Sequence, residues 1–489
     1  MEQVIARHAR AAASWSWPPF WLVAALIGYV IVVFGPVLGD GDTYWHIGAG
    51  TWILQHRAIP HTDPFSYTFA GAPWVAHEWL SEVLMALAYK AGGWNAIVAL
   101  YGAASALTFA LLARHLARWL DPLGVLVVVV CAAACVAPSL LTRPHLLALP
   151  LLVLWSITLV KAKRRGTAPS LLLLPVMTLW ANLHGSFIFG LVLAALIGVE
   201  ALVDTTADRV SVARQWGLFL VSATAVSLLN PNGWHGLVHP VQLMSMMSVA
   251  SITEWKSPDF QHLQPIELVL AALLYVSFAR GVRLPLPRLF ILLGLIHMAL
   301  QHSRHQMVTG VLGAVLLAEP LGRAFRVGDN PAPERRPMVR WILGGFACGV
   351  IATGIRVVHP IARTDDPVSP ISALAHVPAQ ILSEPVFNSY GFGGYLIFRK
   401  IKPFIDGRAD LYGDDFVSDY LTATAPDRTA FERLVTKYQI RWAILHAGTA
   451  VADMIDALPD WRRIYADDHA VVYVRKGGDT RLPTGRTDN

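Results

Sequence analysis

The sequence predicts an all-α polytopic membrane protein of about eleven transmembrane helices, with a small α/β domain at its C-terminal end. Of its 489 residues, 55% are hydrophobic and only 15% are charged, whereas soluble domains carry about 25% charged residues. Apolar runs such as 21–38, 124–136 and 187–199 approach the length that crosses a bilayer. The composition therefore excludes an ordinary soluble domain.

Eleven apolar segments can be counted, and their connections favour one orientation. The segments lie near residues 20–38, 94–113, 122–140, 145–161, 169–182, 186–203, 215–229, 264–280, 288–301, 307–322 and 340–358. A cytoplasmic N-terminus puts Lys or Arg into every cytoplasmic connection, as the bias toward positive residues on that side requires. These basic connections contain residues 114–118, 161–165, 209–214, 280–288 and 323–340. The net charge of +6 thus follows from topology and requires no nucleic-acid partner.

The chain divides into a transmembrane body, residues 1–358, and a soluble domain, residues 359–489. The body includes a large first loop, residues 39–93. After residue 358, runs rich in β-branched and aromatic residues alternate with amphipathic ones. We expect strands at PVFN, KPFIDGR, RWAILH and HAVVYVRK, and helices at DDFVSDYLTA, DRTAFERLVTKY and AVADMIDAL. An odd number of spans places this domain and the first loop on the extracytoplasmic side.

The first loop concentrates ionisable and aromatic residues. Segments 43–55 and 78–90 have apolar residues at helical spacing, which predicts two amphipathic helices lying along the bilayer surface. Asp40 and Asp42 precede the first of them, where a carboxylate caps a helix by accepting backbone N–H groups. Capping would keep that carboxylate ionised and fixed in space. Asp42 and His46 share a helical face, which fits an acid–base pair, two metal ligands or a simple ion pair.

A second cluster in the loop comprises His77, Glu78 and Glu82. Glu78 and Glu82 lie one helical turn apart, a spacing that also fits the solvated face of an interfacial helix. The sequence contains no HExxH or CxxC motif and no evenly spaced set of carboxylates, so spacing alone identifies no metal site. We treat Glu78 as a supporting catalytic candidate beside Asp42 and Asp40.

Polar residues from several further loops fall at the extracytoplasmic ends of the predicted spans. All histidines except His8, His115 and His297 lie on this side. Ionisable groups near a membrane are costly and persist where they line a cavity, so this gathering predicts a single site. The planar fork of Arg fits a phosphate, although snorkelling to lipid headgroups explains the same positions equally well. The candidates for binding a lipid phosphate or sugar are Arg143, His145, Asn182, His184, Lys256, Arg304 and His305.

Two runs in the soluble domain are unusual. NSYGFGGYLIF resembles a phosphate-binding glycine loop only weakly, because no Lys followed by Ser or Thr comes after it. In FIDGRADLYGD, the charged residues Asp406, Arg408 and Asp410 either face the membrane site or fix a turn between a strand and a helix.

The order of these features resembles the GT-C superfamily of polytopic glycosyltransferases, which includes protein O-mannosyltransferases and aminoarabinose transferases. The runs GDGDTYWHIGAGTWIL, DPFSYTFAGAPWVAHEWLSE and DGRADLYG are similar to a group of bacterial membrane proteins assigned to that superfamily, and the likeness covers most of the chain. The resemblance implies a multi-pass protein of the bacterial inner membrane. It also implies transfer of a sugar from a polyprenyl-phosphate carrier to a glycan, lipid or protein acceptor on the outer face.

Carried over to this sequence, the resemblance implies a general base at Asp42, or failing that Asp40, which takes the acceptor proton while the anomeric carbon is attacked with inversion. His46 and Glu78 complete the catalytic candidates. The leaving phosphate gains charge in the transition state and would need the Arg and His candidates named above. Mannosyltransferase-like members often carry an Asp-Glu pair, whereas Thr43 follows Asp42 here. The resemblance therefore leaves the acceptor and a divalent cation open.

Two other functions fit the sequence less fully. A transporter or flippase of a lipid-linked saccharide would place its site near the bilayer midplane, with broken helices in two matching halves. The polar residues here lie instead at one interface, and the halves do not repeat. A catalytically silent protein would use its outer domain to bind a partner in the cell envelope.

Overall fold

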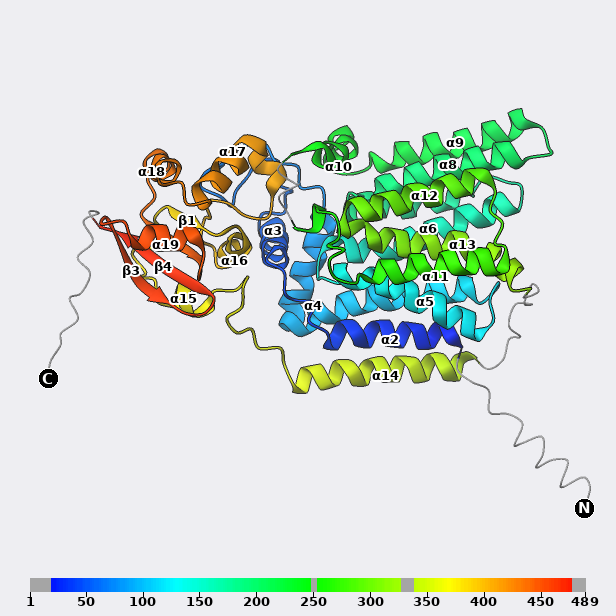
Figure 1. The fold of residues 1–489 in the computed structure, drawn as a ribbon, viewed down its shortest axis with the longest axis horizontal. Helices are drawn as coiled ribbons and strands as arrows, with labels where there is room; N and C mark the ends of the chain where they lie inside the picture. The colour runs from blue at the N-terminus through cyan, green and yellow to red at the C-terminus, as the bar shows by residue number, and fades with distance from the viewer. Residues whose placement is uncertain (1–18, 248–252, 327–337, 477–489) are drawn as a thin grey trace, which may run out of the picture.

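The fold is that of a computed structural model, which describes residues 19–247, 253–326 and 338–476. An elongated bundle of helices lies against a smaller α/β domain, which covers one end of the bundle (Figure 1). His8, with the rest of the N-terminal tail, and most of the basic connection 323–340 fall outside the described residues. The bundle helices are α2 (Phe20–Phe34), α4 (Trp79–Leu116), α5 (Pro122–Val136), α6 (Pro144–Arg164), α7 (Leu174–Leu183), α8 (Phe187–Asp204), α9 (Arg209–Ser227), α11 (Pro265–Arg280), α12 (Leu286–Gln301), α13 (Gln306–Ala324) and α14 (Met338–Val358).

Each apolar segment expected from the sequence coincides with one of these helices. Within the described ranges, six helical stretches are long and apolar enough to cross a membrane, namely Trp79–Leu116, Pro122–Ser139, Pro144–Arg164, Phe187–Asp204, Ser303–Ala324 and Val339–Val358. Three further apolar helices are shorter. The chain is therefore a multi-pass membrane protein.

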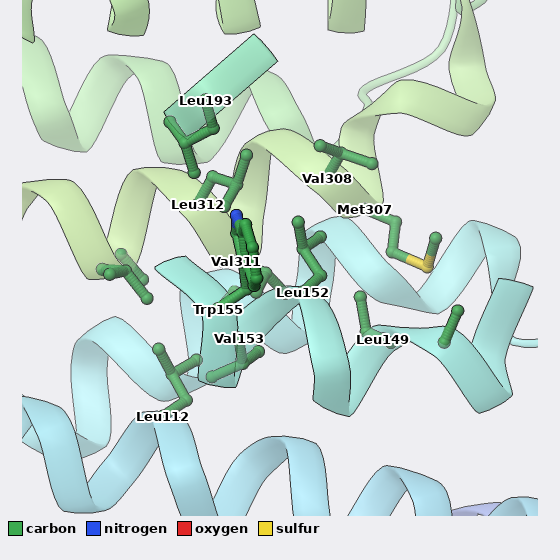
Figure 2. Packing of buried hydrophobic residues seen from close by; sticks show 14 of the residues in the cluster. Leu112, Leu149, Leu152, Val153, Trp155, Leu193, Met307, Val308, Val311 and Leu312 are labelled. Atoms are coloured by element: carbon green, nitrogen blue, oxygen red, sulfur yellow. The ribbon is translucent and has the colours of Figure 1, made fainter. Parts of the chain in front are cut away.

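The centre of the bundle is a hydrophobic core formed by α4, α6, α8 and α13 (Figure 2). Trp155 lies fully buried there, and its indole N–H donates to the carbonyl oxygen of Gly190 at 2.9 Å. This bond satisfies the single polar group of the side chain, so the indole packs among leucines and valines without an unpaired donor.

The basic connections meet at the end of the bundle away from the α/β domain. Lys163 Nζ lies 2.6 Å from Asp204 Oδ2, and the Arg164 guanidinium lies 4.3 Å from the centre of the Trp119 ring. Arg280 lies over Phe325 in the same way, at 5.2 Å. These contacts join connections that are far apart in sequence, as the alternating topology predicts.

Both helices predicted in the first loop are present, but neither is simply an interfacial helix. The first, α3 (Asp42–His56), lies between α4 and α16 (Gly393–Phe398) of the α/β domain (Figure 1), so most of its residues are buried. The second is the start of α4, which continues into the next span across a break at Gly92 and Gly93. Gly93 has a φ of 58°, a conformation that glycine adopts without steric cost.

The α/β domain holds a four-stranded mixed sheet in the order β1-β2-β4-β3. Its β1 (Val386–Asn388) is parallel to β2 (Trp442–His446), and β4 (Ala470–Arg475) is antiparallel to both β2 and β3 (Trp461–Ala466). The helices are α15 (Ile371–Ala375), α16, α17 (Ala409–Thr424), α18 (Arg428–Lys437) and α19 (Ala450–Asp456). The last three of these lie at the segments predicted to be helical.

One predicted strand is wrong and one strand was missed. KPFIDGR forms no strand, because its backbone bonds to a side chain: Phe404 N–H donates to Asn388 Oδ1 at 2.8 Å, and Asn388 Nδ2 donates to the carbonyl oxygen of Ile405 at 2.8 Å. The missed strand, β3, is an edge strand with adjacent exposed arginines, Arg462 and Arg463, which hide the alternation of apolar residues.

The first loop and the α/β domain share one hydrophobic core, in which Trp45 and Trp74 pack with Phe404 and Tyr412. The two tryptophans are nearly inaccessible, so they do not lie at a bilayer surface as an interfacial helix would place them. The loop and the domain therefore fold against each other.

The DGRADLYG run contributes a buried ion-pair cluster to this contact. The Arg408 guanidinium lies 2.7 Å from Asp63 of the first loop and 2.7 Å from Asp406, and it stacks over Trp74 at 4.9 Å. Asp406 also accepts the Tyr412 hydroxyl at 2.6 Å. These residues thus join the two segments.

Glycines allow the domain to approach the N-terminal end of α3 closely. A Cβ atom at Gly394 would collide with the carbonyl oxygen of Gly41, and one at Gly407 would collide with the Asp42 carboxylate. The glycine-rich run is therefore explained by close packing against the first loop.

Candidate active site

A cavity of about 580 Å³ lies where the bundle, the first loop and the α/β domain meet. Side chains reach it from α3, the start of α4, the ends of α6, α8 and α13, and the domain residues that precede and open α17. The predicted site residues that line it are Asp40, Asp42, His46, Glu78, Arg143, His145, His184, Arg304 and His305. The structure thus brings together most of the residues that the sequence placed on one side.

Arg143 is the centre of the polar cluster. It precedes α6, whose first residue is a proline, and its guanidinium projects between the first loop and the short helix η4 (Thr253–Trp255). It forms ion pairs with Asp42, with Asp40 at 2.9 Å and with Glu254 at 2.6 Å. Arg143, expected to bind a ligand phosphate, therefore meets three carboxylates, one of them the candidate base.

Asp40 and Asp42 have different tasks at the start of α3. The Asp40 carboxylate accepts the backbone N–H of Asp42 at 2.7 Å, but the N-cap of α3 is Gly41, so the expectation that one of the two aspartates is the N-cap is wrong. The Asp42 carboxylate faces the cavity. Burial raises the pKa of Asp42 to about 7 against the pull of Arg143, and the charges of Asp40 and Glu254 add to the rise. A carboxylate with such a pKa suits proton abstraction near neutral pH.

Glu254 joins the two arginines of the cavity. Its second oxygen lies 3.2 Å from Arg304 Nη1. Burial opposes ionisation of Glu254, but the guanidiniums of Arg143 and Arg304 prevail and lower its pKa to about 2. Arg304 also lies over the face of Trp255, 4.4 Å from the ring centre. Its side chain is 26% exposed, and among the described residues Glu254 is its one carboxylate partner.

His46 does not pair with Asp42, although the two share a face of α3. Its ring lies 3.8 Å from Glu78 and 3.5 Å from Glu82. Burial lowers the pKa of His46, and the charge of Arg143 acts in the same direction. Glu82 is 1% exposed, so the alternative of a solvated helix face is wrong for this pair.

Glu78 contacts a second histidine, His184. The Nδ1 atom of His184 accepts the Ser186 N–H at 3.0 Å, so the ring proton resides on Nε2, which lies 3.3 Å from Glu78 Oε1. Burial raises the pKa of Glu78 to about 8, despite the charges of Arg304 and Arg143. Glu78 thus lies among imidazoles and does not contact Asp42.

Two predicted ligand residues do not line the cavity. The Asn182 side chain accepts the Trp79 indole N–H at 2.8 Å and donates to the carbonyl oxygens of Thr178 and Leu229, at 2.8 and 3.0 Å. It therefore connects helices. Lys256 is exposed, and its backbone carbonyl accepts from Ser303.

Sequence reasoning gave no role in the site to Glu254 and Tyr390, and it left two alternatives for Asp410; all three line the cavity. Glu254 lies in a polar outer loop, ITEWKSPDF, and its acidic side chain between two spans was the available signal. The other two come from the α/β domain, and the charged run FIDGRADLYGD, for which facing the membrane site was one of two alternatives, was the available signal for Asp410.

No protein-family model matches the sequence, and no curated protein is detectably similar to it. The structure is similar to that of the Archaeoglobus fulgidus oligosaccharyltransferase in the apo form, with a TM-score of 0.53 and 12% identity over 88% of this chain and 70% of that chain. The same enzyme tethered with an acceptor peptide containing the NVT sequon gives a TM-score of 0.51 and 11% identity, over 95% of this chain and 74% of that one.

ArnT from Cupriavidus metallidurans bound to undecaprenyl phosphate is similar with a TM-score of 0.50 and 12% identity, over 93% of this chain and 97% of that chain. Oligosaccharyltransferase and ArnT are both polytopic GT-C enzymes. The expected GT-C-like fold is therefore confirmed.

Proposed function

We propose that this GT-C-like chain is an inverting glycosyltransferase, which moves a sugar from a polyprenyl-phosphate carrier to a glycan, lipid or protein acceptor on the extracytoplasmic face. One observation carries the proposal: Asp42, Arg143 and Arg304 line one cavity at the end of an apolar bundle. Such a transfer needs a base for the acceptor proton and cations for the leaving phosphate, beside a hydrophobic region for the lipid chain. The bound lipid of ArnT and the bound peptide of the oligosaccharyltransferase support this class of donor and acceptor.

The proposed topology has all eleven bundle helices crossing the bacterial inner membrane, with a cytoplasmic N-terminus. The transmembrane body would comprise residues 1–358 and the extracytoplasmic domain residues 359–489. Support comes from the end of the bundle away from the cavity, where Lys163, Arg164 and Arg280 gather. Positive residues accumulate on the cytoplasmic side of membrane proteins, so the cavity would face the other side.

In the proposed reaction, Asp42 accepts the proton of the acceptor hydroxyl as its oxygen attacks the anomeric carbon. The bond between that carbon and the phosphate oxygen breaks, and its electron pair leaves with the polyprenyl phosphate. Attack from the face opposite the leaving group inverts the configuration. Because Asp42 is half-buried beside other carboxylates, its pKa is high enough for it to take a proton near pH 7.

The donor phosphate would bind between Arg143 and Arg304. Glu254 contacts both guanidiniums and so fixes their separation before the donor arrives. Arg143 also contacts Asp42, so a phosphate that draws Arg143 toward itself would weaken this pair and free the carboxylate for the acceptor. Preorganised cations of this kind stabilise the charge that develops on a leaving phosphate.

The test uses purified protein in lipid nanodiscs with a panel of polyprenyl-phosphate sugars, and measures release of polyprenyl phosphate. Asp42→Asn should keep fold and abundance but lower the rate by at least about 100-fold, since general bases contribute about 10²–10⁴-fold. Asp415→Asn, on the exposed face of α17, is the matched control and should keep full activity. Full activity of Asp42→Asn would refute the base, and no release from any donor would refute the reaction. Comparison of envelope glycans with and without the protein would then identify the acceptor.

A further inference from the structure

Three side chains from separate parts of the chain converge beside the cavity, away from Arg143. His77 belongs to the first loop, His239 to α10 (Trp234–Ser245) and Asp410 to the first turn of α17. One ligand atom of each lies within 4.8 Å of the others. His239 Nε2 is 3.3 Å from Asp410 Oδ2, and the centres of the two imidazole rings are 4.7 Å apart.

His239 Nε2 and Asp410 Oδ2 are both buried, and apart from their contact with each other at 3.3 Å neither has a hydrogen-bond partner among the described residues. The Nδ1 atom of His77 donates to the carbonyl oxygen of Val75 at 3.2 Å, which leaves the lone pair of the ring on Nε2. A carbonyl bound to one ring nitrogen is the arrangement that orients a metal-ligating histidine.

We propose that His77, His239 and Asp410 bind a divalent transition-metal ion, with Zn²⁺ as the ion of best fit. Two imidazoles and a carboxylate form a common ligand set for zinc, whereas Ca²⁺ and Mg²⁺ require mainly oxygen ligands. In a tetrahedral zinc site with bonds of about 2.0–2.1 Å, ligand atoms lie about 3.3–3.4 Å apart. His239 Nε2 and Asp410 Oδ2 are already 3.3 Å apart. A small rotation of the His77 side chain would bring its ring nitrogen to the same distance from both, because all three ligand atoms lie within 4.8 Å of one another.

The backbone around the three ligands is held by other contacts. Asn232, in the turn before α10, donates to the carbonyl oxygen of Ala76 at 3.3 Å, next to His77. The Met247 N–H donates to the Asp414 carboxylate at 3.2 Å, which connects the end of α10 to α17. The ligand positions are therefore constrained without the ion, as a binding site requires.

The ion would connect the first loop, the bundle side and the α/β domain at one point. His77 and Asp410 both line the cavity, so a fourth coordination position would open toward it. The site shares no residue with the cluster of Asp42, Arg143 and Arg304, and its occupancy does not depend on the identity of the sugar or acceptor.

The experiment measures zinc binding by the purified full-length protein in detergent. Metal content is determined after purification, the protein is stripped with a chelator, and Zn²⁺ is titrated against a fluorescent competitor. The wild-type chain should bind one Zn²⁺ per chain, and Mg²⁺ should not compete. His239→Ala and Asp410→Asn should each weaken binding by at least about 100-fold, more than loss of an outer-shell partner. His235→Ala on α10 and Asp415→Asn on α17, both exposed, should bind as the wild type does.

A second measurement does not depend on the folding of variants. Co²⁺ added to the stripped wild-type protein should give the intense visible absorption of a four-coordinate site, and Zn²⁺ should abolish it. Wild-type protein that binds no Zn²⁺, or that binds Co²⁺ with only weak six-coordinate absorption, would overturn the proposal. Unchanged zinc affinity in Asp410→Asn would also overturn it. The contact between His239 and Asp410 would then be an ion pair that holds no metal.

Discussion

The proposed base should give sugar transfer an acidic limb with a midpoint near pH 7. Burial raises the pKa of Asp42 from 3.8 to about 7, and the base works only when deprotonated. The rate should therefore fall as pH falls below 7 and level off above about pH 8. About one eleventh of the carboxylates would be ionised at pH 6 and about ten elevenths at pH 8, so the rates should differ about tenfold. An exposed aspartate would keep the rate constant down to about pH 5.

Asp40→Asn perturbs this pKa with little change in structure. The side-chain oxygen of asparagine can accept the same bond, so the contact with the Asp42 N–H can persist while the charge disappears. The Asp40 charge is one cause of the raised pKa of Asp42, so its removal should move the midpoint toward acid. We expect a shift of about one pKa unit, equivalent to 1.36 kcal/mol, and thus several-fold faster transfer at pH 6 relative to the plateau.

The assay records initial rates of polyprenyl phosphate release at saturating donor from pH 5 to pH 9, at constant ionic strength. Thermal unfolding in the same buffers separates titration of the base from loss of folded protein. A wild-type midpoint at or below pH 5 would refute the raised pKa of Asp42. A midpoint that stays fixed or moves toward alkali in Asp40→Asn would refute the electrostatic explanation.

Three further substitutions test the surroundings of the base. Arg304→Ala should raise the apparent KM for donor by about 10–100-fold, because the substitution removes a charge-assisted hydrogen bond to the donor phosphate. Lys256→Ala, at an exposed residue, is the control, and an equal KM in the two variants would contradict the prediction. Arg408→Leu leaves the buried carboxylates of Asp63 and Asp406 unpaired, so it should lower the free energy of unfolding by about 3–5 kcal/mol. An unchanged denaturant midpoint would contradict this prediction. Gly407→Ala places a methyl group against Asp42 and should lower kcat in protein of normal abundance, so an unchanged kcat would show that the carboxylate can move away.

The sequence predicted the helices of the bundle well because the bilayer imposes both their length and their composition. It was less successful where tertiary contacts decide the structure. The periodicity of α3 indicated a helix with an apolar face, but periodicity does not reveal that the α/β domain covers the other face. In KPFIDGR, the residues favour a strand, yet the side chain of Asn388 occupies the backbone groups that a neighbouring strand would use.

The gathering of the candidate residues at one end of the bundle could be predicted, but their partners could not. Arg143 was a candidate for binding a phosphate, and the structure shows it paired with three carboxylates, those of Asp42, Asp40 and Glu254. This pairing depends on where the start of α6 lies relative to α3, two elements about a hundred residues apart. Likewise His77, His239 and Asp410 have no regular spacing, because three separate elements bring them together.

The contribution of the α/β domain to the cavity bears on the function of the whole chain. Tyr390, Gly407 and Asp410 form part of the cavity wall, and the core of the first loop is completed by residues of the domain. A domain that only bound a cell-envelope partner would have no need to approach the Asp42 carboxylate so closely that residue 407 must be glycine. The boundary at residue 359 therefore separates an apolar part of the chain from a part with the composition of a soluble domain, whereas the candidate site is assembled from residues of both parts.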